Sequence, residues 1–353
     1  MGAVLADHPC WLGSLGVTGT ACANAAAAAA DVVVVVGSRL SDFTTASKTQ
    51  FQGDGVRFIS INVNAFDAHK HGAVPVVADA RVALAELGRA LAGVRFDEAL
   101  ASAQRARSAW LDARAAMCQL GGAAVALTQA HVIDTLNERV GPSATVVHAA
   151  GGIPGDLHRL WLSKSADDYH SEYGYSCMGY EVAGALGVKL ARPERDVYAL
   201  LGDGSWLMLA NELVTSLQEH AKITVVLLDN HGYQCIHNLQ RGCGGRSFGN
   251  EFLARSHSGT LSGDVVAVDF VKNAASLGAS TFTARSHDEL VSAIDDARRE
   301  TRSCFIYVPL SEPSRLPGTS WWDVPPAEVS GVPGVVEARR EYVTAKSRQR
   351  FHY

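Results

Sequence analysis

The segment VYALLGDGSWLMLANELVTSLQEHAKITVVLLDNHG, residues 197–232, contains two apolar runs that each end in a polar turn. The run at 197–201 ends in GDG at 202–204, and the second run ends in DNHG at 229–232. Apolar runs of this length are typical of strands buried on both faces of a parallel sheet. Residues 207–219 between them have the composition of a helix, so the segment predicts one βαβ crossover.

A βαβ crossover brings the carboxyl ends of both strands to one edge of the sheet, where open α/β folds bind ligands. We therefore expect Asp203 and Asn230 to face one site. One carboxylate and one amide oxygen suit Mg²⁺, which takes hard oxygen ligands from protein, phosphate and water. Gly204 lets the backbone approach a phosphate, and Ser205 opens a helix whose amides can bind that anion. The alternative is that both motifs are ordinary turns, but their spacing after two apolar strands favours a metal-diphosphate site.

The composition bounds the class of protein. The chain has 353 residues, 47% of them hydrophobic, which is enough for about two domains. Its 31 Lys and Arg residues are dispersed among 36 Asp and Glu residues, which argues against a nucleic-acid partner. The seven cysteines form no CxxC pair, so neither a zinc site nor a disulfide framework is indicated. Without a leader peptide or an apolar stretch of membrane-spanning length, we expect a cytoplasmic protein with no membrane partner.

Apolar runs alternate with helical segments, which predicts an α/β fold of two doubly wound parallel-sheet domains. Residues 1–95 are expected to form a Rossmann-like central domain that is truncated at its N-terminus. Residues 96–125 are expected to be a helical linker, 126–310 a diphosphate- and Mg-binding domain, and 311–353 a C-terminal arm rich in Pro, Gly and Trp. A central domain without its first strand and helix would leave an apolar sheet edge or face uncovered, which predicts association.

Further stretches carry a family resemblance, namely YHSEYGYSCMGY at 169–180, NLQ at 238–240, SFG at 247–249, and SWW at 320–322 followed by AEVS at 327–330. Together with GDG, 24 intervening residues and DN, they resemble the thiamine diphosphate enzymes. Within that family the chain is most similar to the hydrolases of myo-inositol catabolism that open a trihydroxycyclohexane-1,2-dione ring to a 5-deoxy-glucuronate. The resemblance extends along the whole chain.

The resemblance implies thiamine diphosphate and Mg²⁺ as cofactors. It assigns the metal to the side chains of Asp203 and Asn230 and to the backbone carbonyl of Gly232. Met178 would lie under the thiazolium ring, and the carbonyl of Ser176 would accept a hydrogen bond from the aminopyrimidine. Judged alone, Met178 could equally be a flexible core residue. The full set of implied cofactor contacts is Gly151, Gly152, Ser176, Met178, Gly204, Ser205 and Asn230.

The catalytic residue is not identified in this sequence. In the family, a glutamate on an N-terminal pyrimidine domain activates the cofactor of a neighbouring subunit, and no segment here resembles that domain. Glu172, Glu181 and Glu212 belong to the diphosphate half and are not assigned this role. We expect the C-terminal part of a hydrolase of a cyclic polyhydroxy dione, active only with a pyrimidine domain in trans or from an oligomer partner. The alternatives are a non-catalytic remnant or cofactor-binding module, and a 2-oxo acid decarboxylase or acetolactate synthase-like enzyme.

Several histidines lie in segments that could border the site, namely His148, His158, His170, His231 and His237. Each is either a group that moves protons or orients the substrate, or a hydrogen-bonded structural histidine, and the sequence does not choose between these roles. The run His69-Lys70-His71 resembles a pair of metal ligands but lies in the predicted central domain. We expect a solvated loop there.

Overall fold

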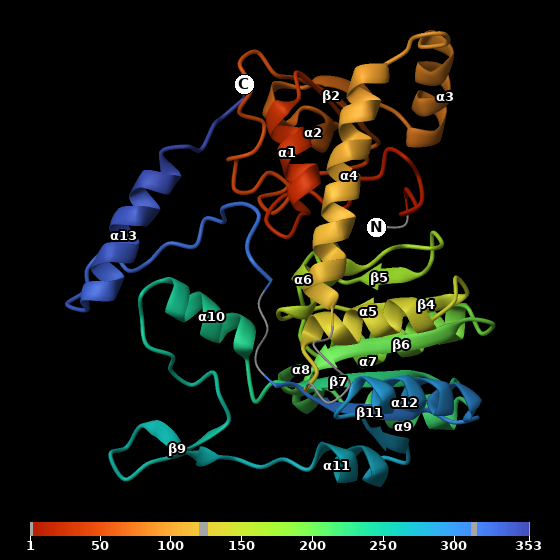
Figure 1. Cartoon of the computed structure of the whole chain (residues 1–353), viewed down its shortest axis with the longest axis vertical. Coiled ribbons are helices and arrows are strands. Elements are labelled where there is room, and N and C mark those ends of the chain that lie inside the picture. The colour runs from red at the N-terminus through yellow and green to blue at the C-terminus, as the bar shows by residue number, and fades with distance from the viewer. Residues whose placement is uncertain (1–2, 120–125, 312–315, 353) are drawn as a thin grey trace. The chain divides into compact units, whose positions relative to one another are not determined.

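The computed structural model describes residues 3–119, 126–311 and 316–352 (Figure 1). The chain divides into two compact units. One consists of Met1–His8 and Arg114–Leu316, and the other of Pro9–Ala113 and Pro317–Tyr353. We call them the six-stranded unit and the three-stranded unit after their main sheets. The predicted central domain and most of the predicted C-terminal arm thus fall in the same unit. No helix in the described residues combines the length and apolar character needed to cross a membrane.

The six-stranded unit contains a wholly parallel sheet in the order β10-β11-β7-β6-β4-β5. The strand order reverses direction at β4, with β5 on one side and β6 and β7 on the other, as in a doubly wound α/β fold. The predicted fold class is confirmed. The strands are β4 (Ala144–His148), β5 (Tyr169–Ser171), β6 (Asp196–Gly202), β7 (Thr224–Asp229), β10 (Ser280–Thr283) and β11 (Cys304–Pro309).

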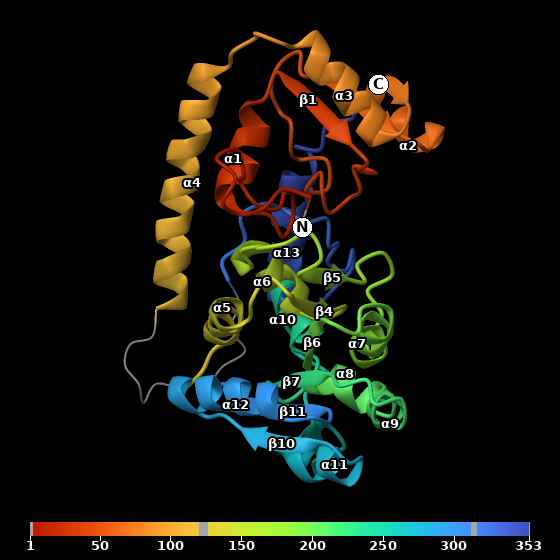
Figure 2. The same cartoon turned by 90° about the vertical axis from the view of Figure 1, so that its right-hand side faces the viewer.

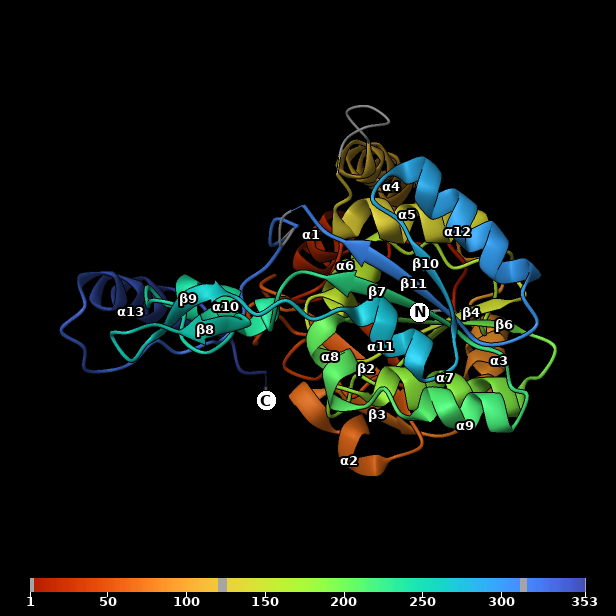
Figure 3. The same ribbon diagram turned by 90° about the horizontal axis from the view of Figure 1, so that it is seen from below.

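Two helical layers cover this sheet (Figure 3). On one face, α5 (Gln129–Arg139), α6 (Ile153–Leu160) and α12 (His287–Arg299) pack on residues such as Leu200 and Val226. On the other face, α7 (Tyr180–Ala191), α8 (Asp203–Met208), α9 (Glu212–Gln218) and α11 (Phe270–Ser276) pack on Leu201, Val225 and Phe305. Because successive strand residues point to opposite faces, both faces are apolar and the strands read as continuous apolar runs.

The predicted crossover differs from the observed one in its helix. Instead of one helix at 207–219, the chain forms α8 and α9, separated at Leu209, where φ is −154° and ψ is 70°. Gly202 is extended and α8 begins at Asp203, so the GDG motif is itself the start of a helix. The two strands pair in parallel with Gly202 opposite Leu228, which sets the two polar turns side by side.

Other elements of this unit lie outside the sheet. The helix α10 (Gln234–Gly242) follows the DNHG turn, and β8 (Leu253–Arg255) pairs with β9 (Leu261–Val265) in an antiparallel ribbon (Figure 1). The long helix α4 (Asp97–Cys118) begins in the three-stranded unit, and its residues from Arg114 onward belong to this unit. Arg114 donates to the Leu160 carbonyl at 2.7 Å and to Asp134 at 2.6 Å.

The three-stranded unit contains a parallel sheet in the order β1-β2-β3. Its core joins sheet residues Val35 and Phe58 to Leu40, Phe51 and Ala73. The strands are β1 (Val32–Val36), β2 (Arg57–Asn62) and β3 (Val74–Val77), and the helices are α1 (Ala21–Ala29), α2 (Ala65–Ala68), the 3₁₀ turn η1 (Lys70–Gly72), α3 (Ala80–Ala90) and, near the C-terminus, α13 (Pro333–Lys346).

The strand β1, labelled in the upper part of Figure 2, has one apolar face that is partly exposed. Val32, Val34 and Val36 are 39%, 46% and 38% exposed, while Val35 between them is buried. In the described part of the chain, β1 pairs with β2 alone, so its other edge carries no strand. An open edge beside an apolar face is the feature that the sequence predicted for this domain, and such edges favour association.

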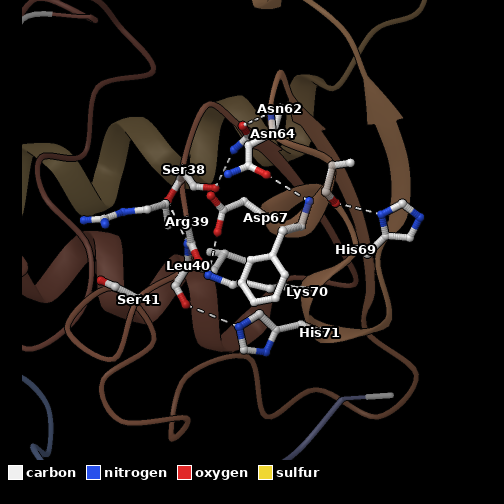
Figure 4. A network of polar contacts seen from close by, with 12 residues as sticks. Ser38, Arg39, Leu40, Ser41, Asn62, Asn64, Asp67, His69, Lys70 and His71 are labelled. Carbon is white, nitrogen blue, oxygen red and sulfur yellow. Dashed lines mark hydrogen bonds and ion pairs between the residues drawn. The ribbon is translucent and has the colours of Figure 1, made fainter.

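The segment around His69 and His71 forms a structural network (Figure 4). Lys70 pairs with Asp67 at 2.6 Å and donates to the Arg39 carbonyl at 3.3 Å. The two histidine rings point apart, and each bonds a different backbone carbonyl, that of Ala65 for His69 and that of Leu40 for His71. These contacts fit a loop held by its own side chains rather than a pair of metal ligands.

Candidate functional site

The GDG and DNHG turns meet at the carboxyl edge of the six-stranded sheet. The backbone amide of Gly232 donates to Oδ2 of Asp203 at 2.9 Å, and the amide of Gly204 donates to Oδ1 at 2.7 Å. Asp203 is fully buried. The structure therefore brings Asp203, Asn230 and Gly232 into one place, as the crossover requires.

A second carboxylate, Asp229, lies beside Asp203. Its Oδ2 accepts from the Tyr307 hydroxyl on β11 at 2.6 Å, and its Oδ1 accepts from the His231 amide at 3.1 Å. Burial, together with the neighbouring Asp229 carboxyl, raises the pKa of Asp203 to about 7. Two like charges held this close in a buried place repel each other, so a cation between the turns would relieve the repulsion.

Asn230 has an unused ligand atom. Its Oδ1 is buried and has no hydrogen-bond partner among the described residues, although its backbone carbonyl accepts from Gln234 at 3.0 Å. Buried amide oxygens are rarely left unpaired, because the lost hydrogen bond to water costs about 1–3 kcal/mol. This oxygen, the Asp203 carboxylate and the Gly232 carbonyl are all hard donors of the kind that Mg²⁺ prefers.

Two glycines at this site admit no side chain. A Cβ atom at Gly232, where φ is 139°, would lie 2.3 Å from the backbone oxygen of Asn250. A Cβ atom at Gly204 would lie 2.6 Å from Cε1 of Tyr233 and 3.3 Å from Cε of Met178. The side chain of Met178 thus reaches the GDG turn, as its predicted place under a bound ring requires.

The other predicted contacts lie on two loops at the same edge. Gly151 and Gly152 follow β4, and a Cβ atom at Gly151, where φ is 90°, would meet nothing within 4 Å. Ser176 has a left-handed φ of 54°, and its hydroxyl lies 3.5 Å from the Ala149 carbonyl. The Gly204 amide, by contrast, is already bonded to Asp203, and α8 is a short helix of six residues. The hydroxyl of Ser205 bonds to Glu181 at 3.2 Å.

The five histidines that could border the site differ in their surroundings. Burial lowers the pKa of His148 well below its usual range, and it lowers the pKa of His158 to about 4. Both rings are therefore neutral at pH 7, each with a single N–H proton. His170 bonds to the Tyr180 hydroxyl and His237 to the Ser247 hydroxyl, each at 2.7 Å. His231 alone combines an exposed ring with a carboxylate neighbour, Asp229 at 3.2 Å.

Sequence reasoning missed two residues of this site. Asp229 was treated only as part of a turn, although a carboxylate directly before Asn230 was a visible signal of an acidic pair. No signal in the sequence indicated the contacts of Glu181. Its partners Ser205 and Ala150 lie 24 and 31 residues away, and no spacing rule connects them to it. Among the described residues, no three His, Cys, Asp or Glu side chains cluster as a metal site of their own, so a metal here would depend on amide, carbonyl and phosphate oxygens as well.

The Asp203–Asp229 pair predicts a pH dependence of stability. The pKa of Asp203 rises from 3.8 to about 7 on folding, so between these values the folded chain binds more protons than the unfolded chain. Its contribution to the free energy of unfolding is therefore lost as pH rises through this window, by at most about 4 kcal/mol in metal-free protein. Urea unfolding from about pH 4 to about pH 8 measures this slope. Asp229→Asn should flatten it, and equal slopes for both proteins would contradict the assignment.

Comparison with known proteins gives two matching family models. The model described as "Thiamine pyrophosphate enzyme, central domain" matches residues 1–87. The model described as "Thiamine pyrophosphate enzyme, C-terminal TPP binding domain" matches residues 149–308. The two models describe domains of the same enzymes, and the second contains every predicted cofactor and metal residue.

Curated relatives match along nearly the whole chain. A protein of Bacillus cereus, named 3D-(3,5/4)-trihydroxycyclohexane-1,2-dione hydrolase 2, is 40% identical over 374 residues, which cover 99% of this chain and 58% of the relative. A protein named 3D-(3,5/4)-trihydroxycyclohexane-1,2-dione hydrolase, from Bacillus anthracis, is 42% identical over 354 residues, covering 93% of this chain and 55% of the relative. The chain thus spans a little over half the length of these relatives.

Proposed function

We propose a function from the fact that this chain belongs to the thiamine pyrophosphate enzyme family. The chain supplies the diphosphate- and metal-binding half of a hydrolase that opens the ring of 3D-(3,5/4)-trihydroxycyclohexane-1,2-dione. The observation that carries the proposal is the junction of the two turns, where the buried Asp203 carboxylate bonds the Gly232 amide beside the unpartnered Asn230 oxygen. The identity of 40–42% to hydrolases of this name supports the substrate class. A place in myo-inositol catabolism is proposed from the family resemblance of the sequence.

The residues at the junction fit a metal-diphosphate group. Asp203, the Asn230 side chain and the Gly232 carbonyl would hold Mg²⁺. The Gly151-Gly152 loop and the Ser205 amide would receive the diphosphate, with Gly204 allowing its close approach while the Gly204 amide stays bonded to Asp203. Met178 and the Ser176 carbonyl would orient the ring system. When bound, thiamine diphosphate supplies a carbon nucleophile and an electron sink, while the protein binds and orients it and governs its protons.

The activating glutamate is proposed to come from a pyrimidine domain, either in trans or from another subunit. Within this chain, Glu181 does not suit that role, because it is fully buried and both of its oxygens are bonded to the chain itself. The cytoplasm is the proposed compartment, since the spacing of the seven cysteines indicates no disulfide framework.

A second candidate is a module that binds the cofactor without turning over substrate. The observation that favours it is that every proposed cofactor and metal residue lies in the stretch matched by the TPP binding domain, residues 149–308. The two candidates share the same cofactor site and differ in whether ring opening follows.

Calorimetry with thiamine diphosphate, with and without Mg²⁺, followed by a ring-opening assay of the dione, tests both candidates. We expect Mg²⁺-dependent binding by the chain alone, and ring opening after addition of the part of the Bacillus cereus relative that this chain does not match, which is proposed to supply the pyrimidine domain. Absence of binding would overturn the site. Binding without ring opening in the mixture, under conditions where the intact relative is active, would overturn the hydrolase and leave the binding module.

A further inference from the structure

Glu181 lies on the first turn of α7 and is fully buried. Its carboxylate accepts three hydrogen bonds from the chain. Oε1 accepts from the Ala150 amide and from the Ser205 hydroxyl, each at 3.2 Å, and Oε2 accepts from the Gly179 amide at 2.9 Å. Both oxygens are therefore occupied, and two of the three donors lie far away in the sequence.

The three donors belong to the three segments on which the proposed cofactor site depends. Ala150 precedes Gly151 and Gly152 after β4, Gly179 follows Met178, and Ser205 follows Gly204 in the GDG turn. The Asp203 carboxylate, by comparison, accepts from its own turn and from the DNHG turn. The single carboxylate of Glu181 thus links the loop after β4, the turn before α7 and the start of α8.

A structural explanation by helix capping covers only part of this arrangement. An acidic residue in the first turn of a helix stabilises that helix by about 0.3–1 kcal/mol, and it does so at the surface. Glu181 is instead buried, which costs free energy unless its oxygens are bonded. Burial raises the pKa of Glu181, and the three hydrogen bonds lower it. The effect of burial is the larger one, so the pKa lies above its usual value. The free-energy cost of burying this carboxyl exceeds what helix capping returns, but the buried carboxyl also bonds three separate segments to one another.

We propose that Glu181 is a positioning residue that holds these three segments in the arrangement that accepts the diphosphate of thiamine diphosphate. This inference rests on the proposed function for the identity of the ligand. Glu181 does not contact the cofactor itself. It fixes the Ala150–Gly152 backbone relative to the Gly204–Ser205 backbone, so that the phosphate-facing amides keep their spacing before the ligand arrives. Preorganisation of this kind raises affinity because less order has to be created on binding.

The test uses two substitutions of Glu181. Glu181→Ala removes all three bonds, and we expect it to weaken Mg²⁺-dependent thiamine diphosphate binding by about 10- to 100-fold, the usual effect of losing a partner that orients a ligand. Glu181→Gln keeps one oxygen that can accept from Ala150 and Ser205 but sets its NH₂ group against the Gly179 amide, so it should recover part of the affinity. Glu212→Ala is the matched control, because Glu212 also lies in the first turn of its helix, α9, and has no part in these loops.

A second ligand separates positioning from general loss of structure. Inorganic pyrophosphate with Mg²⁺ has the diphosphate group without the rings of the cofactor. Glu181→Ala should therefore weaken the binding of pyrophosphate and of thiamine diphosphate by the same factor. Thermal unfolding of the metal-free variants shows whether affinity merely follows stability. Unchanged affinity in Glu181→Ala, or equal losses in the alanine and glutamine variants, would overturn the inference. Failure of the unsubstituted chain to bind either ligand would instead overturn the proposed function.

Discussion

Asp203→Asn is expected to weaken Mg²⁺-dependent binding of thiamine diphosphate by more than about 100-fold. Mutation of a residue that only hydrogen-bonds to a metal ligand already lowers metal affinity by about 10- to 100-fold, and Asp203 is proposed as a ligand itself. The carboxylate is the only charged group among the three proposed ligands. The substitution also places an amide NH₂ against one of the two backbone amides that now donate to it, those of Gly204 and Gly232. Calorimetric titration with the cofactor at saturating Mg²⁺ measures the effect.

The metal-free Asp203→Asn protein should remain folded, which makes the result interpretable. Removing one of two neighbouring buried carboxyls relieves the repulsion with Asp229, and this offsets the cost of the misplaced NH₂ group. Thermal unfolding monitored by circular dichroism checks this point. Asp264→Asn, at an exposed aspartate of the same unit, is the control and should bind normally. Retention of full affinity by Asp203→Asn would show that the metal is held elsewhere.

The sequence predicted this junction because its causes are local. Strands buried on both faces must be apolar throughout, so β6 and β7 were visible as runs, and one crossover sufficed to place their ends together. The break at Leu209 was not visible, because residues 207–219 contain neither Gly nor Pro and have ordinary helix formers on both sides. The tertiary packing of α8 and α9 on the sheet overrides that propensity.

Contacts between distant segments were beyond the reach of pattern reasoning. The bond from Tyr307 to Asp229 spans 78 residues and exists because β11 is the sheet neighbour of β7, which only the strand order reveals. The C-terminal arm shows a different limit. The arm as a whole is rich in Pro, Gly and Trp, and this average composition did not indicate the helix α13. Residues 337–341 of that helix are good helix formers, and they include the ion pair Glu337–Arg340.

Trp206 connects the stability of the fold to the shape of the site. It lies on α8, two residues after Gly204, and its side chain is fully buried. The indole nitrogen donates to Oδ1 of Asn273 on α11 at 2.8 Å, and the ring lies 4.7 Å from that of Phe305 on β11. Through these two contacts Trp206 holds α8, which begins in the GDG motif, against β11 and α11.

Trp206→Ala is expected to lower the free energy of unfolding by about 4 kcal/mol, because it leaves a large cavity and an unpaired Asn273 amide. Urea unfolding of the metal-free protein measures the loss. Leu207→Ala, at the adjacent and 48% exposed residue of α8, is the matched control and should cost about 1 kcal/mol or less. Thiamine diphosphate and Mg²⁺ at about 100 times the dissociation constant should restore up to about 2.7 kcal/mol if α8 carries the site. If the variant is as stable as the control, Trp206 does not anchor α8. If the cofactor restores no stability although the variant is folded, the result contradicts a cofactor site on α8.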